Sequence, residues 1–130
     1  MGIRSIFSKP LAAYMAAQQR KWSLNPSASQ TKVFQQNIKA ASSTVFGKDH
    51  NFEKIKTYDD FKKYVPIRDY EELKPYIEKI LNGESDVLWP GKPAYFAKTS
   101  GTTSGTKYIP ITKDSIPNHI GSAKNALLSY

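Results

Sequence analysis

The sequence predicts an α+β fold that is mostly helical, with four to five helices and one β-hairpin. The 130 residues, of which 39% are hydrophobic, suffice for one hydrophobic core. Apolar residues recur at helical spacing over most of the chain. Two short apolar runs near the C-terminus flank a stretch of serine, threonine and glycine, which is the pattern of a hairpin. We therefore divide the chain into a basic helical pair (1–47), short helices (57–83), a hairpin (94–112) and a last helix (113–130).

Residues 1–47 are expected to form two helices. Ser8 can cap the first, with Pro10 in its first turn, and Asn25 and Pro26 can supply the cap and first turn of the second. One stripe at helical spacing along the first helix consists of Leu11, Tyr14, Met15, Gln18 and Trp22. The stripe of the second is Val33, Phe34, Ile38, Ala41 and Val45, and this helix is expected to close at Gly47. We expect the two stripes to pack on each other.

Two capping patterns start the short helices of residues 57–83. Thr57 is followed three residues later by Asp60, and Asp69 is followed by Glu72. The first helix is predicted to stop at Val65, because Pro66 disfavours a helical conformation in the residue before it. Pro75 lies too deep for the first turn of the second helix. A kink or two abutting segments are therefore predicted there, ending at Gly83, with a loop over 83–93.

The hairpin is predicted from two strands, Ala94–Lys98 and Lys107–Ile111. Pro110 lacks an N–H group, so the second strand is expected at a sheet edge. Thr112 or Ser115 then caps the last helix. Its apolar side is predicted to contain Ile116, Ile120, Ala123 and Leu127.

The charge of the chain is concentrated near its start. The net charge is +8, and residues 1–48 contain seven lysines and arginines with no acidic residue. Such a surface can meet phosphates, an acidic partner or an anionic membrane, or can be a solvated helical face. No stretch is apolar enough to cross a membrane. The absence of cysteine excludes disulfides and thiol chemistry, so a cytoplasmic location is expected.

The connection between the two strands is rich in phosphate-binding groups. This connection is longer than the roughly two to five residues that a hairpin turn needs. Gly101 and Gly105 allow N–H groups to converge on an anion, and Lys107 adds a positive charge at the exit. The hydroxyl groups come from Thr99, Ser100, Thr102, Thr103, Ser104 and Thr106. The spacing fits neither the Walker pattern nor GxGxxG, so these residues predict either an anion site or a long hydroxyl-rich loop.

The string TSGTTSGTK, between two strands, resembles the phosphate loop of the adenylate-forming enzymes, the superfamily of acyl-CoA synthetases and firefly luciferase. The preceding stretch FKKYVPIRDYEELKPYIEKILNG is similar to one branch of it. This branch is the auxin-responsive acyl-acid amido synthetases, in particular their bacterial relatives. The resemblance covers roughly residues 33–113.

The resemblance implies an enzyme that adenylates a carboxylic acid with ATP and Mg²⁺ and transfers the acyl group to an amino acid. The implied role of Thr99–Lys107 is to hold the ATP phosphates, and Ile116, His119 and Ile120 would lie in the substrate region. In the plant enzymes of this family the helix after the loop often places an arginine facing the acid, and no arginine follows Arg68 here, so the resemblance argues against a plant hormone substrate. No metal-ligating residue is predicted.

The resemblance also implies that the chain is the opening segment of a larger α/β adenylation domain. Alone, it is expected to be inactive and prone to self-association through open strand edges. The alternative is a non-enzymatic basic module that binds an anionic partner. Nucleic acid is the less expected partner, because no nucleic-acid motif is present.

Overall fold

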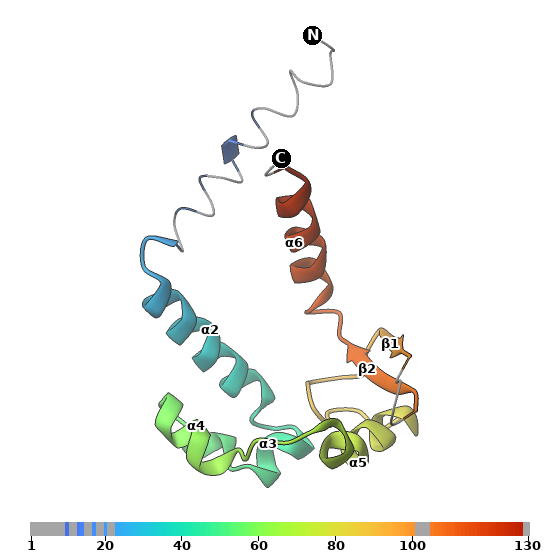
Figure 1. Ribbon diagram of the computed structural model, residues 1–130. Coiled ribbons are helices and arrows are strands. Elements are labelled where there is room, and N and C mark those ends of the chain that lie inside the picture. Colours follow the sequence, from blue (N-terminus) through green and yellow to red (C-terminus); the bar gives the residue numbers. More distant parts are fainter. Residues whose placement is uncertain are drawn as a thin grey trace. The chain divides into compact units, whose positions relative to one another are not determined.

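The computed structural model describes residues 10, 13, 14, 17, 20, 23–100 and 105–128. In chain order the elements are α2 (Pro26–Ala41), α3 (Val45–Asp49), the 3-10 helix η1 (Phe52–Lys54), α4 (Tyr58–Tyr64), α5 (Tyr70–Leu81), β1 (Tyr95–Thr99), β2 (Lys107–Ile111) and α6 (Ile116–Leu128) (Figure 1). This confirms the mostly helical α+β fold with one hairpin. The chain divides into two units, residues 34–113 and residues 1–33 with 114–130.

The first predicted helix falls largely outside the described residues. Ser8, Leu11, Met15, Gln18 and Trp22 all lie there, and so does the predicted packing of the two N-terminal stripes. The described positions from Pro10 to Arg20 are helical and exposed. The predicted start of α2 is confirmed, because the Asn25 side chain accepts the N–H of Ala28 at 3.2 Å.

The predicted helix closing at Gly47 is wrong, because the chain breaks between α2 and α3. α2 ends at Ala41, and α3 begins at Val45 after the cap residue Thr44. The buried Thr44 hydroxyl donates to the Ala41 carbonyl at 2.7 Å and accepts the N–H of Gly47 at 3.0 Å. Serine and threonine hydroxyls compete with the helical backbone in this way, so the Ser42–Thr44 run ends one helix and starts another.

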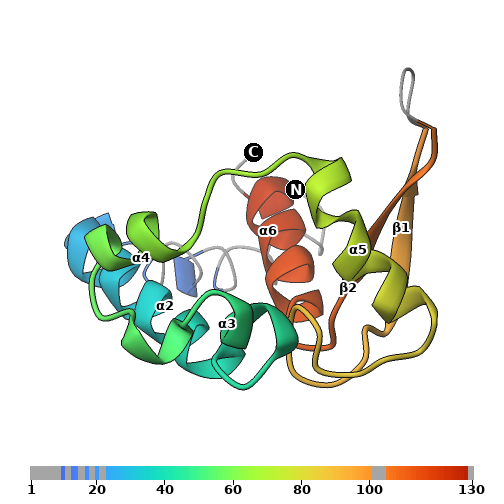
Figure 2. The ribbon, with the colours of Figure 1, turned by 90° about the horizontal axis from the view of Figure 1, so that it is seen from below.

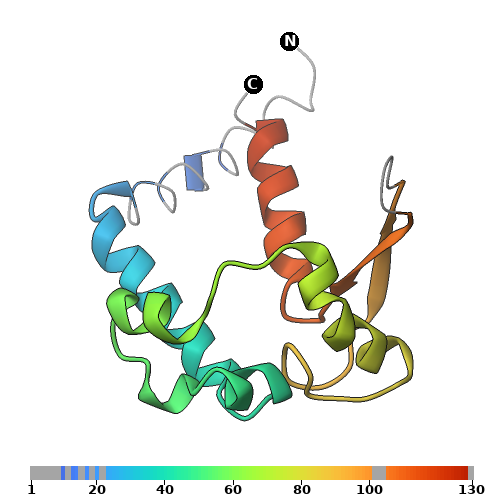
Figure 3. The same cartoon turned by 60° about the horizontal axis from the view of Figure 1, so that its bottom comes forward.

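Gly47 lies inside α3 and has a packing role. A Cβ atom at this buried position would lie 2.1 Å from the Ala41 carbonyl oxygen. The first turn of α3 is also fixed from the other side, because the N–H groups of Val45 and Phe46 donate to the carbonyls of Asp86 and Val87 at 2.8 and 2.9 Å. The loop after α5 therefore packs against α3 (Figure 3).

Besides Ile77, Ile80 and Val87, the 34–113 unit buries a hydrophobic cluster formed by helix α2, helix α4 and η1. Its buried members are Ile38, Ala41, Phe52 and Ile55, with Phe34, Phe46, Phe61, Tyr64, Val65 and Trp89 packed around them. α4 lies against α2 (Figure 2), where the rings of Phe34 and Phe61 meet edge to face at 5.7 Å. Trp89 is thus a packing residue.

Both predicted capping boxes are present. Thr57 and Asp60 exchange side-chain to backbone hydrogen bonds at the start of α4, and Asp69 and Glu72 do so at the start of α5. α4 ends at Tyr64, and Val65, where the helix was predicted to stop, is its C-cap residue.

Of the two alternatives predicted at Pro75, the two abutting segments are wrong, because α5 is one helix from Tyr70 to Leu81, and it ends two residues before Gly83. Pro75 removes one backbone hydrogen bond. The capping box at one end and the buried side chains of Ile77 and Ile80 at the other keep the helix continuous.

A small polar network connects α3 with α5. His50 is 4% exposed, and its Nδ1 lies 2.8 Å from the Phe46 carbonyl. Its Nε2 lies 3.1 Å from the Arg68 guanidinium, which can only donate, so that nitrogen is the acceptor of this hydrogen bond. The Tyr76 hydroxyl donates to Asp49 at 2.8 Å. Burial and this hydrogen bond raise the pKa of the Tyr76 phenol.

The hairpin is antiparallel, with Tyr95 opposite Ile111 and Thr99 opposite Lys107. β1 begins and ends one residue later than predicted, although the Ala94 N–H still donates to the Ile111 carbonyl at 2.8 Å. Pro110 lies in an edge strand, as predicted, because the sheet has two strands. Tyr95 is 68% exposed. Self-association through this surface stays a prediction.

Of the two predicted cap residues for the last helix, Thr112 and Ser115, the structure selects Ser115, because α6 begins at Ile116. The Ser115 carbonyl accepts the N–H groups of Asn118 and His119 at 3.1 and 3.2 Å, which puts Ser115 and not Thr112 directly before the helix. Across the described stretches of the chain, no helix combines the length and apolar character that a bilayer crossing needs.

Candidate functional site

The serine, threonine and glycine loop lies at the tip of the hairpin. Thr99 and Lys107 form the last cross-strand pair, so residues 100–106 connect the strands. Gly101, Thr102, Thr103 and Ser104 lie outside the described residues, while Ser100, Gly105 and Thr106 lie within them. The structure therefore fixes the two ends of the loop and brings Thr99 and Lys107 opposite each other.

The described loop residues offer their polar groups to solvent. Thr99, Ser100, Gly105 and Thr106 are exposed, and Lys107 is half-buried. Gly105 has a φ of +78°, a left-handed conformation that side chains disfavour. A Cβ atom there would meet nothing within 4 Å, so its glycine is required by backbone conformation and not by crowding.

The stretch of sequence around the loop carries only positive charge. Residues 87–113 contain four lysines and no aspartate or glutamate. These lysines are Lys92, Lys98, Lys107 and Lys113. Exposed hydroxyl groups, a left-handed glycine and a positive field are together suited to an anion.

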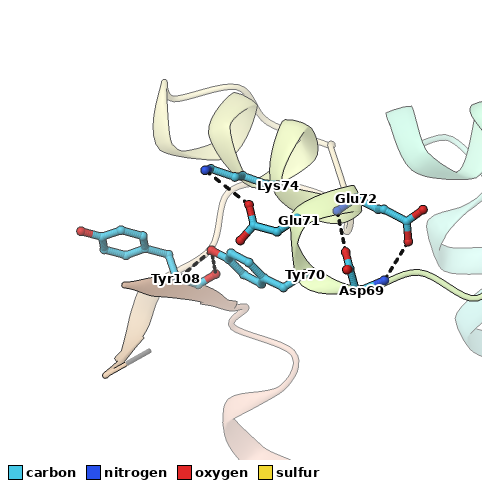
Figure 4. Close-up of polar contacts among 6 residues, drawn as sticks. All are labelled: Asp69, Tyr70, Glu71, Glu72, Lys74 and Tyr108. Carbon is cyan, nitrogen blue, oxygen red and sulfur yellow. Dashed lines mark hydrogen bonds and ion pairs between the residues drawn. The ribbon is translucent and has the colours of Figure 1, made fainter. Parts of the chain in front are cut away.

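Lys107 packs on a residue that the sequence did not single out. Its ammonium lies 5.3 Å from the centre of the Tyr70 ring, within the range of a cation–π interaction. The Tyr70 hydroxyl accepts the N–H of Tyr108 at 2.8 Å and lies 3.4 Å from the carbonyl of the same residue (Figure 4). The capping box predicted that a helix starts at Tyr70, but no sequence pattern indicated what its side chain contacts.

The three residues predicted for the substrate region belong to α6, in the other unit. Ile116 is half-buried, His119 is exposed and Ile120 is 50% exposed. Ile116 and Ile120 lie one turn apart on the same helix face. The exposure of His119 agrees with the commoner role of a solitary histidine, a solvated surface side chain.

In the part of the chain that the structure describes, no three histidine, aspartate or glutamate side chains gather into a metal site.

Two open hollows on the 34–113 unit are the other candidates. One, of about 410 Å³, is lined by Phe34, Asn37, Ile38, Ala41, Phe46, Phe52, Phe61, Leu73, Leu88 and Trp89. The other, of about 480 Å³, is lined by Gln35, Ile38, Lys39, Ser42, Phe52, Glu53, Ile55 and Lys56. The first is almost wholly apolar, and the charged residues of the second are exposed. Neither combines the donors that mark the hairpin loop.

Comparison with known families identifies the chain. A family model described as the GH3 family N-terminal domain matches residues 15–129. The chain belongs to the GH3 family. GH3 proteins are the auxin-responsive acyl-acid amido synthetases, so the resemblance to this family is confirmed. No match was found among curated proteins.

Proposed function

We propose that this GH3 N-terminal domain contributes the phosphate-binding loop of an ATP-dependent acyl-acid amido synthetase of the bacterial type, within the adenylate-forming superfamily. The observation that carries the proposal is the loop itself. A left-handed glycine, exposed hydroxyls and Lys107 occur together at one hairpin tip, in a stretch of the sequence without acidic residues. Such a donor set fits the oxygens of a polyphosphate.

The proposed reaction has two steps. In the first, a carboxylate oxygen of the acid attacks the α-phosphorus of ATP, the bond to the β-phosphate breaks, and pyrophosphate leaves with its electron pair. In the second, an amino acid amine attacks the acyl carbon, AMP leaves, and the amine loses a proton to solvent or a base. The products are the amide, AMP and pyrophosphate.

The loop would act in the first step by positioning and charge neutralisation. Backbone N–H groups and the hydroxyls of residues such as Ser100 and Thr106 would hold the β- and γ-phosphates. The Lys107 ammonium would offset the negative charge that builds up on the leaving pyrophosphate. Mg²⁺, bound with the nucleotide, would supply further charge neutralisation on the phosphate oxygens. Ile116, His119 and Ile120 remain our proposal for the substrate region.

ATP–pyrophosphate exchange with a panel of carboxylic acids tests this proposal. We expect the full-length protein to show acid-dependent exchange. The exchange rate should fall at least about tenfold with Lys107→Ala, because this substitution removes one contact to the phosphates. Lys92→Ala is the matched control, because Lys92 is an exposed lysine of the same acid-free stretch outside the loop. No exchange in the folded protein, or equal losses in both variants, would overturn the proposal.

The second candidate is a basic module that binds an anionic partner. Lys32, Lys39 and Lys48 are exposed, and no acidic side chain occurs among residues 23–48. Binding of this kind falls steeply as salt rises. Fluorescence anisotropy with a labelled nucleic acid and with acidic peptides, across a salt series, distinguishes it from the first candidate, which predicts no such binding.

A further inference from the structure

Tyr70 connects helix α5 to the exit of the hairpin loop. Its hydroxyl accepts the N–H of Tyr108 at 2.8 Å and donates to the carbonyl of Tyr108 at 3.4 Å. Figure 4 shows the phenol reaching from the first turn of α5 to this point of β2. A single hydroxyl thus bonds both backbone groups of the residue that directly follows Lys107.

The ring of the same tyrosine contacts the Lys107 side chain. The distance of 5.3 Å from the Lys107 ammonium to the ring centre falls within the roughly 6 Å over which a cation and an aromatic face attract. Tyr70 therefore restrains Lys107 twice, through the backbone of its neighbour and through its charged end. A lysine side chain has four rotatable bonds, so it loses more conformational entropy than most side chains when a contact holds it in one conformation.

The position of Tyr70 is itself firmly determined. It is the first residue of α5, directly after the cap residue Asp69. The Asp69 carboxylate accepts the N–H of Glu72 at 3.0 Å, and the Glu72 carboxylate accepts the N–H of Asp69 at 2.9 Å (Figure 4). This capping box fixes where the helix begins. The phenol thus projects from a rigid element, which is what precise positioning of a functional group requires.

We propose that Tyr70 is a positioning residue of the nucleotide site. It fixes the course of β2 at the loop exit and orders the Lys107 ammonium before the phosphates arrive. Ordering in advance strengthens binding because less freedom remains to be lost on association. This inference rests on the function proposed above, and it assigns to Tyr70 an effect on the nucleotide and not on the acid.

Steady-state exchange assays on the full-length protein test the inference. Tyr70→Phe keeps the ring and removes the hydroxyl, whereas Tyr70→Leu removes both interactions. We expect the KM for ATP to rise about threefold with Tyr70→Phe and about tenfold with Tyr70→Leu, while the KM for the acid stays unchanged. Tyr76→Phe is the matched control, because Tyr76 lies on the same helix and bonds Asp49 instead of the hairpin.

A double-mutant comparison adds a second readout. If Tyr70 acts through Lys107, then Tyr70→Leu should weaken ATP use far less in a Lys107→Ala background than in the wild type. A purely structural role would lower stability in both backgrounds and would raise both KM values alike. If Tyr70→Leu does not fold, the conservative Tyr70→Phe variant still decides the question.

The outcomes separate the two proposals. If exchange depends on Lys107 but the Tyr70 variants behave like Tyr76→Phe, the inference about Tyr70 is overturned and the proposed function stands. If the folded wild type shows no acid-dependent exchange, the proposed function fails and takes the inference with it. A rise in the KM for ATP alone, absent in Tyr76→Phe, supports both.

Discussion

Substituting Gly47 by alanine tests the packing of α3 on the end of α2. The added Cβ atom would lie 2.1 Å from the Ala41 carbonyl oxygen and 3.0 Å from its carbon. Neither side can easily give way. The Ala41 oxygen accepts the hydroxyl of Thr44 at 2.7 Å, and the first turn of α3 is bonded to the carbonyls of Asp86 and Val87.

Two opposing effects set the expected magnitude. Alanine favours a helix over glycine by about 1 kcal/mol. Overpacking a rigid core costs about 1–3 kcal/mol and sometimes more, and this contact is far inside van der Waals range and involves backbone. The steric effect therefore dominates, and we expect Gly47→Ala to lower the free energy of unfolding by about 2 kcal/mol.

Urea denaturation followed by far-ultraviolet circular dichroism measures this loss, and hydrogen exchange of the Val45 and Phe46 amides reports it locally. Gly121→Ala is the matched control. Gly121 is also inside a helix, but nothing lies within 4 Å of its added Cβ. There the same substitution should stabilise by about 0.5–1 kcal/mol. A Gly47→Ala protein as stable as the wild type would refute the steric reasoning.

Three further predictions concern the same unit. Thr44→Val removes the fully buried hydroxyl that caps α3 and should cost about 1–2 kcal/mol in urea denaturation, whereas Thr44→Ser should cost less. The hydrogen bond from the Gly91 N–H lowers the pKa of Asp86, so its contribution to stability is present above the usual carboxyl pKa and is lost as pH falls through the lowered one. Melting temperatures measured on acidification should fall less steeply for Asp86→Asn. The pKa of Tyr76 is raised by burial and by its bond to Asp49, so its contribution is lost as pH rises beyond the usual value of 10.0. Tyr76→Phe should reduce this alkaline loss, measured as the urea midpoint against pH.

The sequence by itself determined the elements whose signals are local. The capping boxes at Thr57 and Asp69 located the starts of α4 and α5 to the residue, because both partners of each box are three positions apart. The hairpin strands were located to within one residue, because two short apolar runs on either side of a glycine-rich stretch are compatible with few structures other than a hairpin. The candidate phosphate loop was also visible in the sequence, as a composition that suits no core.

Only the tertiary structure decided what distant residues do to one another. The continuous stripe from Val33 to Val45 suggested one helix, but the hydroxyl of Thr44 and the carbonyls of Asp86 and Val87 satisfy the backbone of two shorter ones. In the sequence, Gly47 looked like the residue that ends a helix. Its close approach to the Ala41 carbonyl could not be predicted, because it depends on how α3 packs against the end of α2. These contacts depend on how the elements come together in space, which helical periodicity and capping patterns do not encode.

Tyr70 illustrates the same division between local and tertiary information. The sequence predicted a helix start at this residue, and it predicted that Lys107 closes the loop. The contact between their side chains spans 37 positions and exists because α5 packs beside β2. Local propensity fixes where each residue lies on its own element, whereas packing of the elements brings a phenol under an ammonium group at the exit of the loop.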